Sequence, residues 1–260
     1  MPRLAVIFDC DHRATSPLVL ENLRTTIALF GERAEVISVF HSDSAPPPLP
    51  GRVLHLTSAD IFDAFAHRKA RTIIPGNEDL KLIAAAQRLP EFTHFIHHEY
   101  DVWHNNPEPE LVDRLCEAAI GGTFGASWIR PKSDEYADWM WWPSLVAPPH
   151  VLAVPMAAML PLSFFPASFL NAYRDHLIQG WSGHFEVLMP TLAGRLGVPM
   201  VQLGAQGLNV ALDAHMRALR SHRPDVPAGG FYHPVKTLDD VPQAQRPGSD
   251  VVPRSPPAGL

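Results

Sequence analysis

Two acidic side chains separated by one residue follow an apolar segment near the middle of the chain. Glu99 and Asp101 come directly after THFIHH in the run THFIHHEYDVW. Carboxylates at positions i and i+2 can place oxygen atoms around one hard divalent cation, and Mg²⁺ or Mn²⁺ suits this role because such ions share their remaining positions with phosphate oxygens and water. The pattern therefore predicts either a metal-diphosphate site or a pair of solvated loop acids.

The segments around these acids alternate between strand and helix patterns. Compact apolar runs predict strands at residues 4–8, 34–40, 52–56, 93–98, 122–129 and 199–203. Capping residues and helical spacing predict helices that start at Ser16, at Ser58 (with Ile61 and Phe65 on its apolar face) and at Asn77, and further helices at 107–119, 166–178 and 185–196. Residues 131–149 are an aromatic-rich insertion, and residues 154–162 are apolar. The alternation predicts an α/β sheet, in which ligands bind at the carboxyl ends of strands.

The composition is that of a soluble globular protein. The chain has 260 residues, 46% of them hydrophobic and 18% charged, which suits one large domain with a substantial core. The formal charge is −6, and Lys and Arg are scattered, which argues against nucleic acid as a partner.

The cysteines and the apolar runs indicate where in the cell the protein is expected. Cys10 and Cys116 are far apart in the sequence and suggest neither a disulfide framework nor a cysteine zinc site. The first apolar run is too short for a signal peptide, and no run approaches the roughly 20 apolar residues of a membrane span. We therefore expect a cytoplasmic protein without a transmembrane segment. The composition also allows an oligomer.

The strand that ends in E-Y-D resembles the DXD motif of nucleotide-sugar glycosyltransferases of the GT-A fold, with Glu99 in place of the first aspartate. Three other segments occur in the order that such enzymes show. PGNEDLKLIAAAQ (75–87) is similar to the helix beneath the donor nucleotide, GHFEVLMPTLAGRLG (183–197) to the acceptor-side segment with an acid at a helix start, and FYHPVK (231–236) to the segment with the late metal-binding histidine. The resemblance covers residues 4–236.

The resemblance implies a fold and a metal site. The fold would be a single GT-A-like domain at 1–240, a Rossmann-like mixed sheet flanked by helices, with a donor-nucleotide half at 1–106 and an acceptor half at 107–240. Residues 241–260 have the composition of a disordered tail. Asp101 would be the principal ligand of Mn²⁺ or Mg²⁺, Glu99 a direct or water-mediated ligand or a ribose contact, and His233 the late ligand.

The resemblance also implies the reaction. A sugar would pass from a nucleotide-diphosphate donor to a hydroxyl of a glycan, glycolipid or small molecule. Glu186 would be the general base of an inverting displacement, although a retaining outcome stays open, and Lys236 would meet the departing diphosphate.

Four further residues would contact the donor. Asp9, Asp11 and Arg13 would lie near its base and ribose. Asn77 is foremost a helix cap, and a helix N-terminus can also face anionic ligands.

Other interpretations of the same residues stay open. VIFDCDH (6–12) resembles the nucleophile motif of haloacid-dehalogenase-type phosphatases, in which Asp9 would attack phosphorus and Asp11 would act as acid/base. Arg13 and the lack of a late acidic pair depart from that family. A non-catalytic nucleotide-binding module is the third class. In it Glu186 would be a helix-start carboxylate and His233 a surface histidine.

Histidine and tryptophan clusters invite two more interpretations. His97 and His98 sit in a histidine-rich segment, but alternation along a strand would send their side chains to opposite faces, which argues against a zinc cluster. Trp139, Trp141 and Trp142 could stack on a sugar or close over the site, and core packing or an oligomer interface is the competing interpretation.

Overall fold

The computed structural model describes residues 3–63, 76–105, 109–134, 137, 139–151, 153–207, 210–212 and 230–235. The strands are β1 (Leu4–Cys10), β2 (Glu35–His41), β3 (Arg52–Leu56), β4 (His94–Glu99), β5 (Trp103–Asn105), β6 (Phe124–Pro131), β7 (Met156–Pro166), β8 (Met200–Gln202), β9 (Val210–Leu212) and β10 (Gly230–His233). The helices are α1 (Pro17–Phe30), α2 (Ser58–Phe62), α3 (Glu78–Arg88), α4 (Pro109–Ile120), α5 (Ala167–Ile178) and α6 (Phe185–Arg195), with short 3-10 turns η1 (His12–Thr15), η4 (Trp142–Ser144) and η5 (Gly204–Gln206).

Seven strands form the main sheet in the order β3-β2-β1-β4-β7-β6-β8. β7 runs antiparallel to both of its neighbours, and the other pairs in this sheet are parallel. β1 is buried along its whole length, as expected of an apolar strand covered on both faces. The expected fold class, a Rossmann-like mixed sheet flanked by helices, is confirmed.

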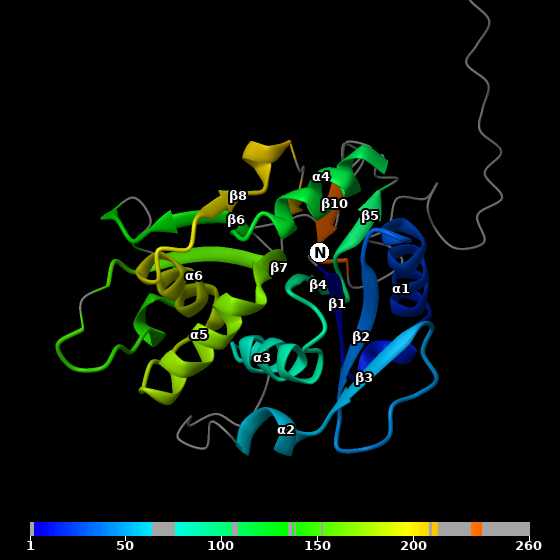
Figure 1. The fold of residues 1–260 in the computed structure, drawn as a ribbon, viewed down its shortest axis with the longest axis horizontal. Coiled ribbons are helices and arrows are strands. Elements are labelled where there is room, and N and C mark those ends of the chain that lie inside the picture. The colour runs from blue at the N-terminus through cyan, green and yellow to red at the C-terminus, as the bar shows by residue number, and fades with distance from the viewer. Residues whose placement is uncertain are drawn as a thin grey trace, which may run out of the picture.

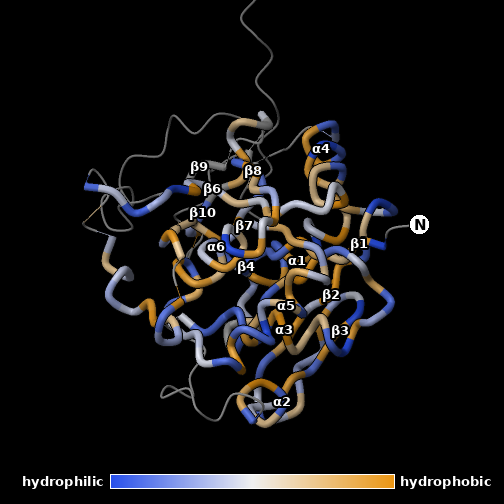
Figure 2. The backbone as a smooth tube through the Cα atoms, turned by 60° about the vertical axis from the view of Figure 1, so that its left-hand side comes forward, coloured by the Kyte–Doolittle hydropathy of each residue, from blue (hydrophilic) through white to orange (hydrophobic). Residues whose placement is uncertain are grey.

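The helices cover both faces of this sheet (Figure 1). α2, α3, α5 and α6 pack on one face, where Ile7, Phe95 and Phe165 belong to the core. α1 and α4 pack on the other face, where Phe8 and Phe164 belong to a second core. Hydrophobic segments gather in the middle of the molecule in Figure 2, and hydrophilic segments follow its periphery. The two cores hold the sheet rigid, which fixes its carboxyl edge.

A second, three-stranded sheet lies beyond the end of β4. Its order is β5-β10-β9, and β10 pairs antiparallel with β5. Figure 1 shows β10, in orange, beside β5, although the two are far apart in the sequence. This pairing carries the late segment of the chain back to the acidic turn that follows β4.

Most predicted elements are confirmed, with differences at caps and in one strand. The cap of α2 is Thr57, which forms a capping box with Asp60, so the prediction of Ser58 as the cap is wrong. Ser16 and Asn77 occupy N-cap positions without a side-chain capping bond. The apolar segment at 154–162 is the start of β7, whose antiparallel course the sequence pattern did not indicate. Phe65 and residues 241–260 lie outside the described residues.

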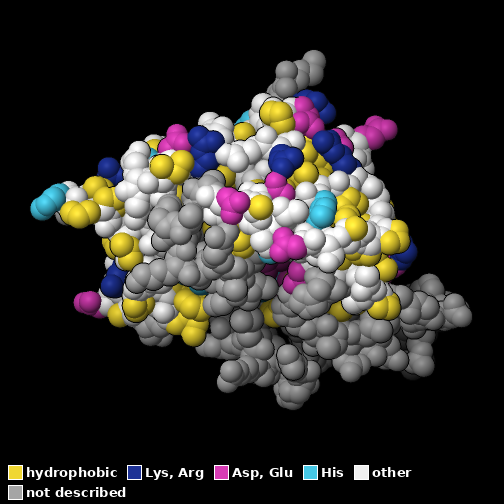
Figure 3. Space-filling view, turned by 90° about the horizontal axis from the view of Figure 1, so that it is seen from below, with side chains coloured by type: hydrophobic (Ala, Val, Ile, Leu, Met, Phe, Trp, Pro, Cys, Tyr) yellow, Lys and Arg dark blue, Asp and Glu magenta, His cyan; other side chains and the backbone are white. Residues whose placement is uncertain are grey.

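The described helices and the surface in Figure 3 bear on membrane and nucleic-acid binding. Among the described helices, none has the length and apolar character needed to span a bilayer. On the face shown in Figure 3, Lys and Arg side chains are interspersed with acidic ones rather than gathered in one patch.

Candidate active site at the carboxyl edge of the sheet

Two carboxylates and one histidine meet where β4 ends. Glu99 is the last residue of β4, Asp101 lies in the turn that follows, and His233 is the last residue of β10. His233 Nε2 lies 3.2 Å from Glu99 Oε2 and 3.4 Å from Asp101 Oδ1. One donor atom from each residue falls within 4.8 Å of the others. The structure thus brings together the three residues predicted to bind a metal.

Backbone hydrogen bonds shape the turn that carries these carboxylates. Val102 N donates to Glu99 O at 3.0 Å, which closes the turn, and Val235 N donates to Asp101 O at 2.9 Å. The second bond fastens the segment after β10 to Asp101. His233 is therefore held beside the turn by the pairing of β10 with β5 before it and by the bond from Val235 to Asp101 after it.

The residues present fit a divalent cation. Asp101 is 1% exposed and His233 is 7% exposed, so their donor groups are largely removed from water. Buried carboxylates need a compensating charge, and two carboxylate oxygens with one imidazole nitrogen form a common ligand set for divalent metals. A cation held there would keep other coordination positions for ligand oxygens or water.

The carboxylates control the protonation of His233. Burial acts to lower the pKa of this imidazole, but Asp101 and Glu99 outweigh burial and raise the pKa to about 9. His233 is therefore an imidazolium at neutral pH when no metal is bound. In that state a proton supplies part of the positive charge that the carboxylates require.

Glu186 lies in the first turn of α6, close enough to Glu99 and His233 to interact with their charges. Its side chain is 12% exposed. Burial and then the charge of Glu99 raise the pKa of Glu186 to about 8, while His233 and a hydrogen bond from Trp141 act to lower it. Glu186 thus shares an electrostatic environment with Glu99 and His233, as a residue of one site would.

His184 and Trp141 shape the start of α6. His184 Nδ1 accepts a hydrogen bond from Glu186 N at 3.3 Å and so caps the helix. The ring of Trp141 stacks on His184 with centroids 3.9 Å apart. Burial lowers the pKa of His184 to about 4, so the ring is neutral and its approach to the Glu186 carboxylate at 3.8 Å is no ion pair. Sequence reasoning missed His184, since histidine is an uncommon helix cap.

Glu78, in the first turn of α3, is a further buried acid. Burial and then the charge of Glu99 raise its pKa to about 9, and its Oε2 atom is buried without a hydrogen-bond partner. α3 and α6 begin side by side, because Phe185 N donates to Gly76 O at 3.1 Å. A Cβ on Gly76 would lie 2.6 Å from His184 Cδ2, and Gly76 has φ +92, so this close approach requires glycine.

Asp9 belongs to a separate polar group beneath the site. It pairs in register with Glu99 on the neighbouring strand, but its carboxylate forms an ion pair with Lys81 of α3. Burial raises the pKa of Asp9, whereas Lys81 and His97 lower it more strongly. His97 and Lys81 thus supply Asp9 with partners from within the protein, and sequence reasoning did not single out Lys81.

The remaining predicted residues fall in different places. Asn77 is 7% exposed at the N-cap of α3, and Asp11 lies between β1 and η1. Arg13 lies in η1, and its side chain, like the whole of Lys236, is outside what the structure describes. His97 and His98 do face opposite sides of β4: His97 meets Leu160 O, and His98 stacks on Phe8.

The tryptophans pack against the protein. Trp142 is 6% exposed and joins Ala157 and Val187 in a small apolar cluster, against which Trp139 and Trp141 also pack. The packing interpretation is therefore confirmed for Trp142, and Trp141 borders the site through His184.

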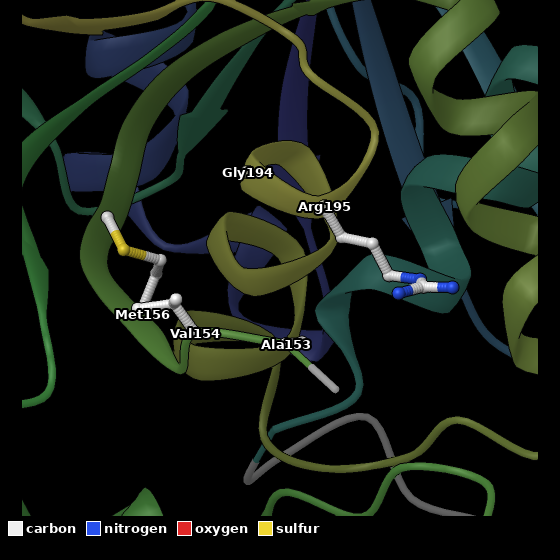
Figure 4. Close-up of a pocket in the computed structure, with 5 residues that line it drawn as sticks. All are labelled: Ala153, Val154, Met156, Gly194 and Arg195. Carbon is white, nitrogen blue, oxygen red and sulfur yellow. The ribbon is translucent and has the colours of Figure 1, made fainter. Parts of the chain in front are cut away.

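A shallow pocket of about 300 Å³ lies away from these groups. Its lining comprises Ala153, Val154, Met156, Gly194 and Arg195 (Figure 4). It adjoins the end of α6 opposite to Glu186, and Figure 4 shows the Arg195 guanidinium pointing away from Met156. None of the described residues that line the pocket is an acid or a histidine, so we place the candidate site at the carboxyl edge.

Comparisons with known proteins add a structural similarity. No protein-family model matches the chain, and no curated protein matches it. Among solved structures, the chain is similar to the crystal structure of mouse xyloside xylosyltransferase 1 in its apo form, with a TM-score of 0.48 and 13% sequence identity over 89% of this chain and 96% of that chain. A likeness of this size says nothing about activity, which has to be judged from the site.

Proposed function

We propose that the protein is a metal-dependent glycosyltransferase of the GT-A type, which moves a sugar from a nucleotide-diphosphate donor to a hydroxyl acceptor with inversion. One observation carries the proposal: Glu99, Asp101 and His233 converge at the carboxyl end of β4. In an open α/β sheet this edge is where nucleotides bind. A site of two acids and a histidine there, with a further acid beside it, suits transfer from a diphosphate leaving group.

In this proposal the three residues hold Mn²⁺ or Mg²⁺. The cation, when bound, would stabilise the negative charge that develops on the departing diphosphate. Asp101 is the principal ligand because its buried carboxylate has the greatest need of a counter-charge. Glu99, at 21% side-chain exposure, is the carboxylate ligand nearer to solvent.

Glu186 is the proposed general base. It would accept the proton of the acceptor hydroxyl as that oxygen attacks the sugar carbon and the bond to the diphosphate breaks. A pKa of about 8 is close to neutral pH, which suits a base that must be ionised yet still hold the proton it takes. Because Glu99 raises this pKa, neutralisation of Glu99 by a cation would favour the ionised base.

The donor nucleotide is proposed to lie across β1 and the start of α3. The residues assigned to it are Asp9, Asp11, Arg13 and Asn77, with Lys236 assigned to the diphosphate. Asp9 would act through its ion pair with Lys81 rather than as a free carboxylate. The N-terminus of α3 presents backbone N–H groups, which favour anionic ligands.

Donor hydrolysis tests this proposal. The protein is incubated with a panel of nucleotide sugars and Mn²⁺, and release of nucleoside diphosphate is measured together with thermal shift. We expect a response to at least one donor, lost on addition of EDTA and in Asp101→Ala. The control is Asp113→Ala, an exposed acid on α4, which should respond as wild type. No response to any nucleotide sugar would contradict the proposal.

The same assay separates the other classes. Hydrolysis of a generic aryl phosphate that is abolished by Asp9→Asn would indicate the phosphatase instead. Nucleotide binding without transfer, unchanged by Glu186→Gln, would indicate a binding module.

A further inference from the structure

A buried asparagine on α1 contacts the turn that carries the two carboxylates. Asn22 is 1% exposed, and its side-chain Nδ2 donates to Tyr100 O at 2.8 Å and to Val102 O at 2.7 Å. These carbonyls lie on either side of Asp101. One amide group therefore holds the carbonyl groups of the residues before and after the proposed principal metal ligand.

The environment of Asn22 would suit an apolar residue better. Leu18, Val19 and Leu23 on the same helix are buried in apolar surroundings. The Oδ1 atom of Asn22 is buried without a hydrogen-bond partner, and such an atom costs about 1–3 kcal/mol. The unpartnered oxygen of Asn22 therefore costs stability, at the position from which the Nδ2 group reaches the turn after β4.

Thr26, one helical turn after Asn22 on α1, is linked through two histidines to Glu99, where the acidic turn begins. Thr26 Oγ1 lies 3.0 Å from His104 Nε2, which in turn lies 3.0 Å from His98 Nε2, and His98 Nδ1 lies 3.0 Å from Glu99 O. Burial lowers the pKa of His98 to about 3 and lowers that of His104 well below its usual value. Both rings are neutral, so His98 Nδ1 donates to Glu99 O, and the single Nε2–H of His104 is shared between His98 Nε2 and Thr26 Oγ1. Thr26 Oγ1 itself donates to Asn22 O at 2.8 Å.

We propose that Asn22 is a positioning residue of the metal site, which sets the direction of the Asp101 carboxylate by holding the carbonyls on both sides of it. This inference rests on the proposed function, because it assumes that Asp101 binds a cation. The ordinary alternative is that Asn22 simply stabilises the fold. The two differ in one respect: a positioning residue changes cation affinity by more than its effect on stability explains.

Mn²⁺ binding and metal-free stability, measured on the same variants, test the inference. Mn²⁺ affinity is measured with MnCl₂ alone by titration calorimetry and by the EPR signal of free Mn²⁺, and stability by thermal unfolding in EDTA. We expect Asn22→Ala to weaken Mn²⁺ binding by about 10- to 100-fold, the range typical when a group that supports a metal ligand is removed.

The matched control is the neighbouring residue on the same helix. Leu23 is fully buried and packs in the core of the α1 face. We expect Leu23→Ala to lower the Tm by at least as much as Asn22→Ala and to leave the Mn²⁺ affinity of the folded protein within about twofold, since it removes packing without touching the turn. If Asn22→Ala does not fold, Asn22→Leu serves in its place, because it removes both donors and the unpartnered oxygen.

The outcomes separate this inference from the proposed function. If wild type binds Mn²⁺ and the folded Asn22 variant binds it within twofold, Asn22 has no positioning role and the proposed function still stands. The same holds if Leu23→Ala weakens binding as much as the Asn22 variant does. If wild type does not bind Mn²⁺ at all, the metal site fails, and the inference fails with it.

Discussion

Two groups that contain carboxylates lie at the ends of neighbouring strands, β1 and β4, and different side chains balance their negative charge. Asp9 is paired with Lys81, whose side chain is 3% exposed, and His97 approaches it at 3.7 Å. Glu99 and Asp101 instead meet His233, whose Nε2 atom lies 3.2 Å from Glu99 Oε2 and 3.4 Å from Asp101 Oδ1. The first group carries a permanent positive charge, and the second carries one that can be lost.

This difference indicates which group can exchange its positive charge for a metal ion. Lys81 forms an ion pair with Asp9 inside the protein, so the Asp9 group is complete as folded. Histidine can release its proton, and the released position can then accept a metal ion. The Asp9 group is therefore expected to matter for stability, and the Glu99 group for binding and chemistry.

The largest expected effect is on stability, from removal of the permanent cation. Lys81→Met leaves the Asp9 carboxylate buried without its main partner, and we expect a loss of about 3–5 kcal/mol in the free energy of unfolding. Urea denaturation at neutral pH measures it. The double variant Asp9→Asn/Lys81→Met should recover much of this loss. As control, Arg52→Met removes an exposed cation from Glu35 and Glu91 and should cost below about 1 kcal/mol. Equal effects in Lys81→Met and Arg52→Met would contradict the comparison.

The second effect is on turnover, from removal of the proposed general base beside the Glu99 group. Glu186→Gln keeps the size of the side chain but cannot accept a proton, so we expect kcat to fall by about 10²- to 10⁴-fold. The Kd for Mn²⁺ and for the donor should change little, because Glu186 is not a proposed ligand. Steady-state transfer rates and calorimetry check the two parts. Normal turnover in Glu186→Gln would refute its assignment as the base.

The third effect is on the pH dependence of metal binding. The raised pKa of His233 means that its proton stabilises the folded protein below the ordinary pKa of histidine, and this contribution is lost as the pH rises through about 9. A cation that binds Nε2 must displace that proton, so Mn²⁺ affinity should rise by up to about tenfold per pH unit between pH 6 and 8. Calorimetry in buffers of different ionisation enthalpy also counts the released proton. His233→Gln should bind more weakly and lose this dependence; a flat profile in wild type would exclude His233 as a ligand.

The residues of the Glu99 group could be predicted from the sequence, whereas the buried residues around them, Lys81 and Asn22, could not. Glu99 and Asp101 could be found because a strand end is a local pattern, whereas His233 was placed with them through its resemblance to a late motif. Lys81 occupies a helix position where lysine is usually solvated, and its burial depends on how α3 packs against β1. Asn22 likewise has no local signal, since its partners lie 78 and 80 residues away. The antiparallel course of β7 is also set by packing and not by its own pattern.

The smallest expected effect is on the pH dependence of stability, from Glu78. It tests whether the negative charge of the Glu99 group also acts on Glu78. Its raised pKa means that the folded protein holds a proton that the unfolded chain releases above pH 4.5. Stability should therefore fall as the pH rises from about 4.5 towards 9, with a slope of at most about 1.4 kcal/mol per pH unit from this group. Glu78→Gln removes that contribution and should raise the Tm at pH 8 relative to wild type, with a smaller difference at pH 5.

Thermal unfolding between pH 5 and 8 measures this, with Glu110→Gln at the exposed start of α4 as the matched control. An unchanged profile in Glu78→Gln would show that the carboxyl is already balanced within the site. A lower Tm at pH 8 would show that Glu78 is an ionised partner there, which would move it from the surroundings of Glu99 into the set of groups that hold a cation.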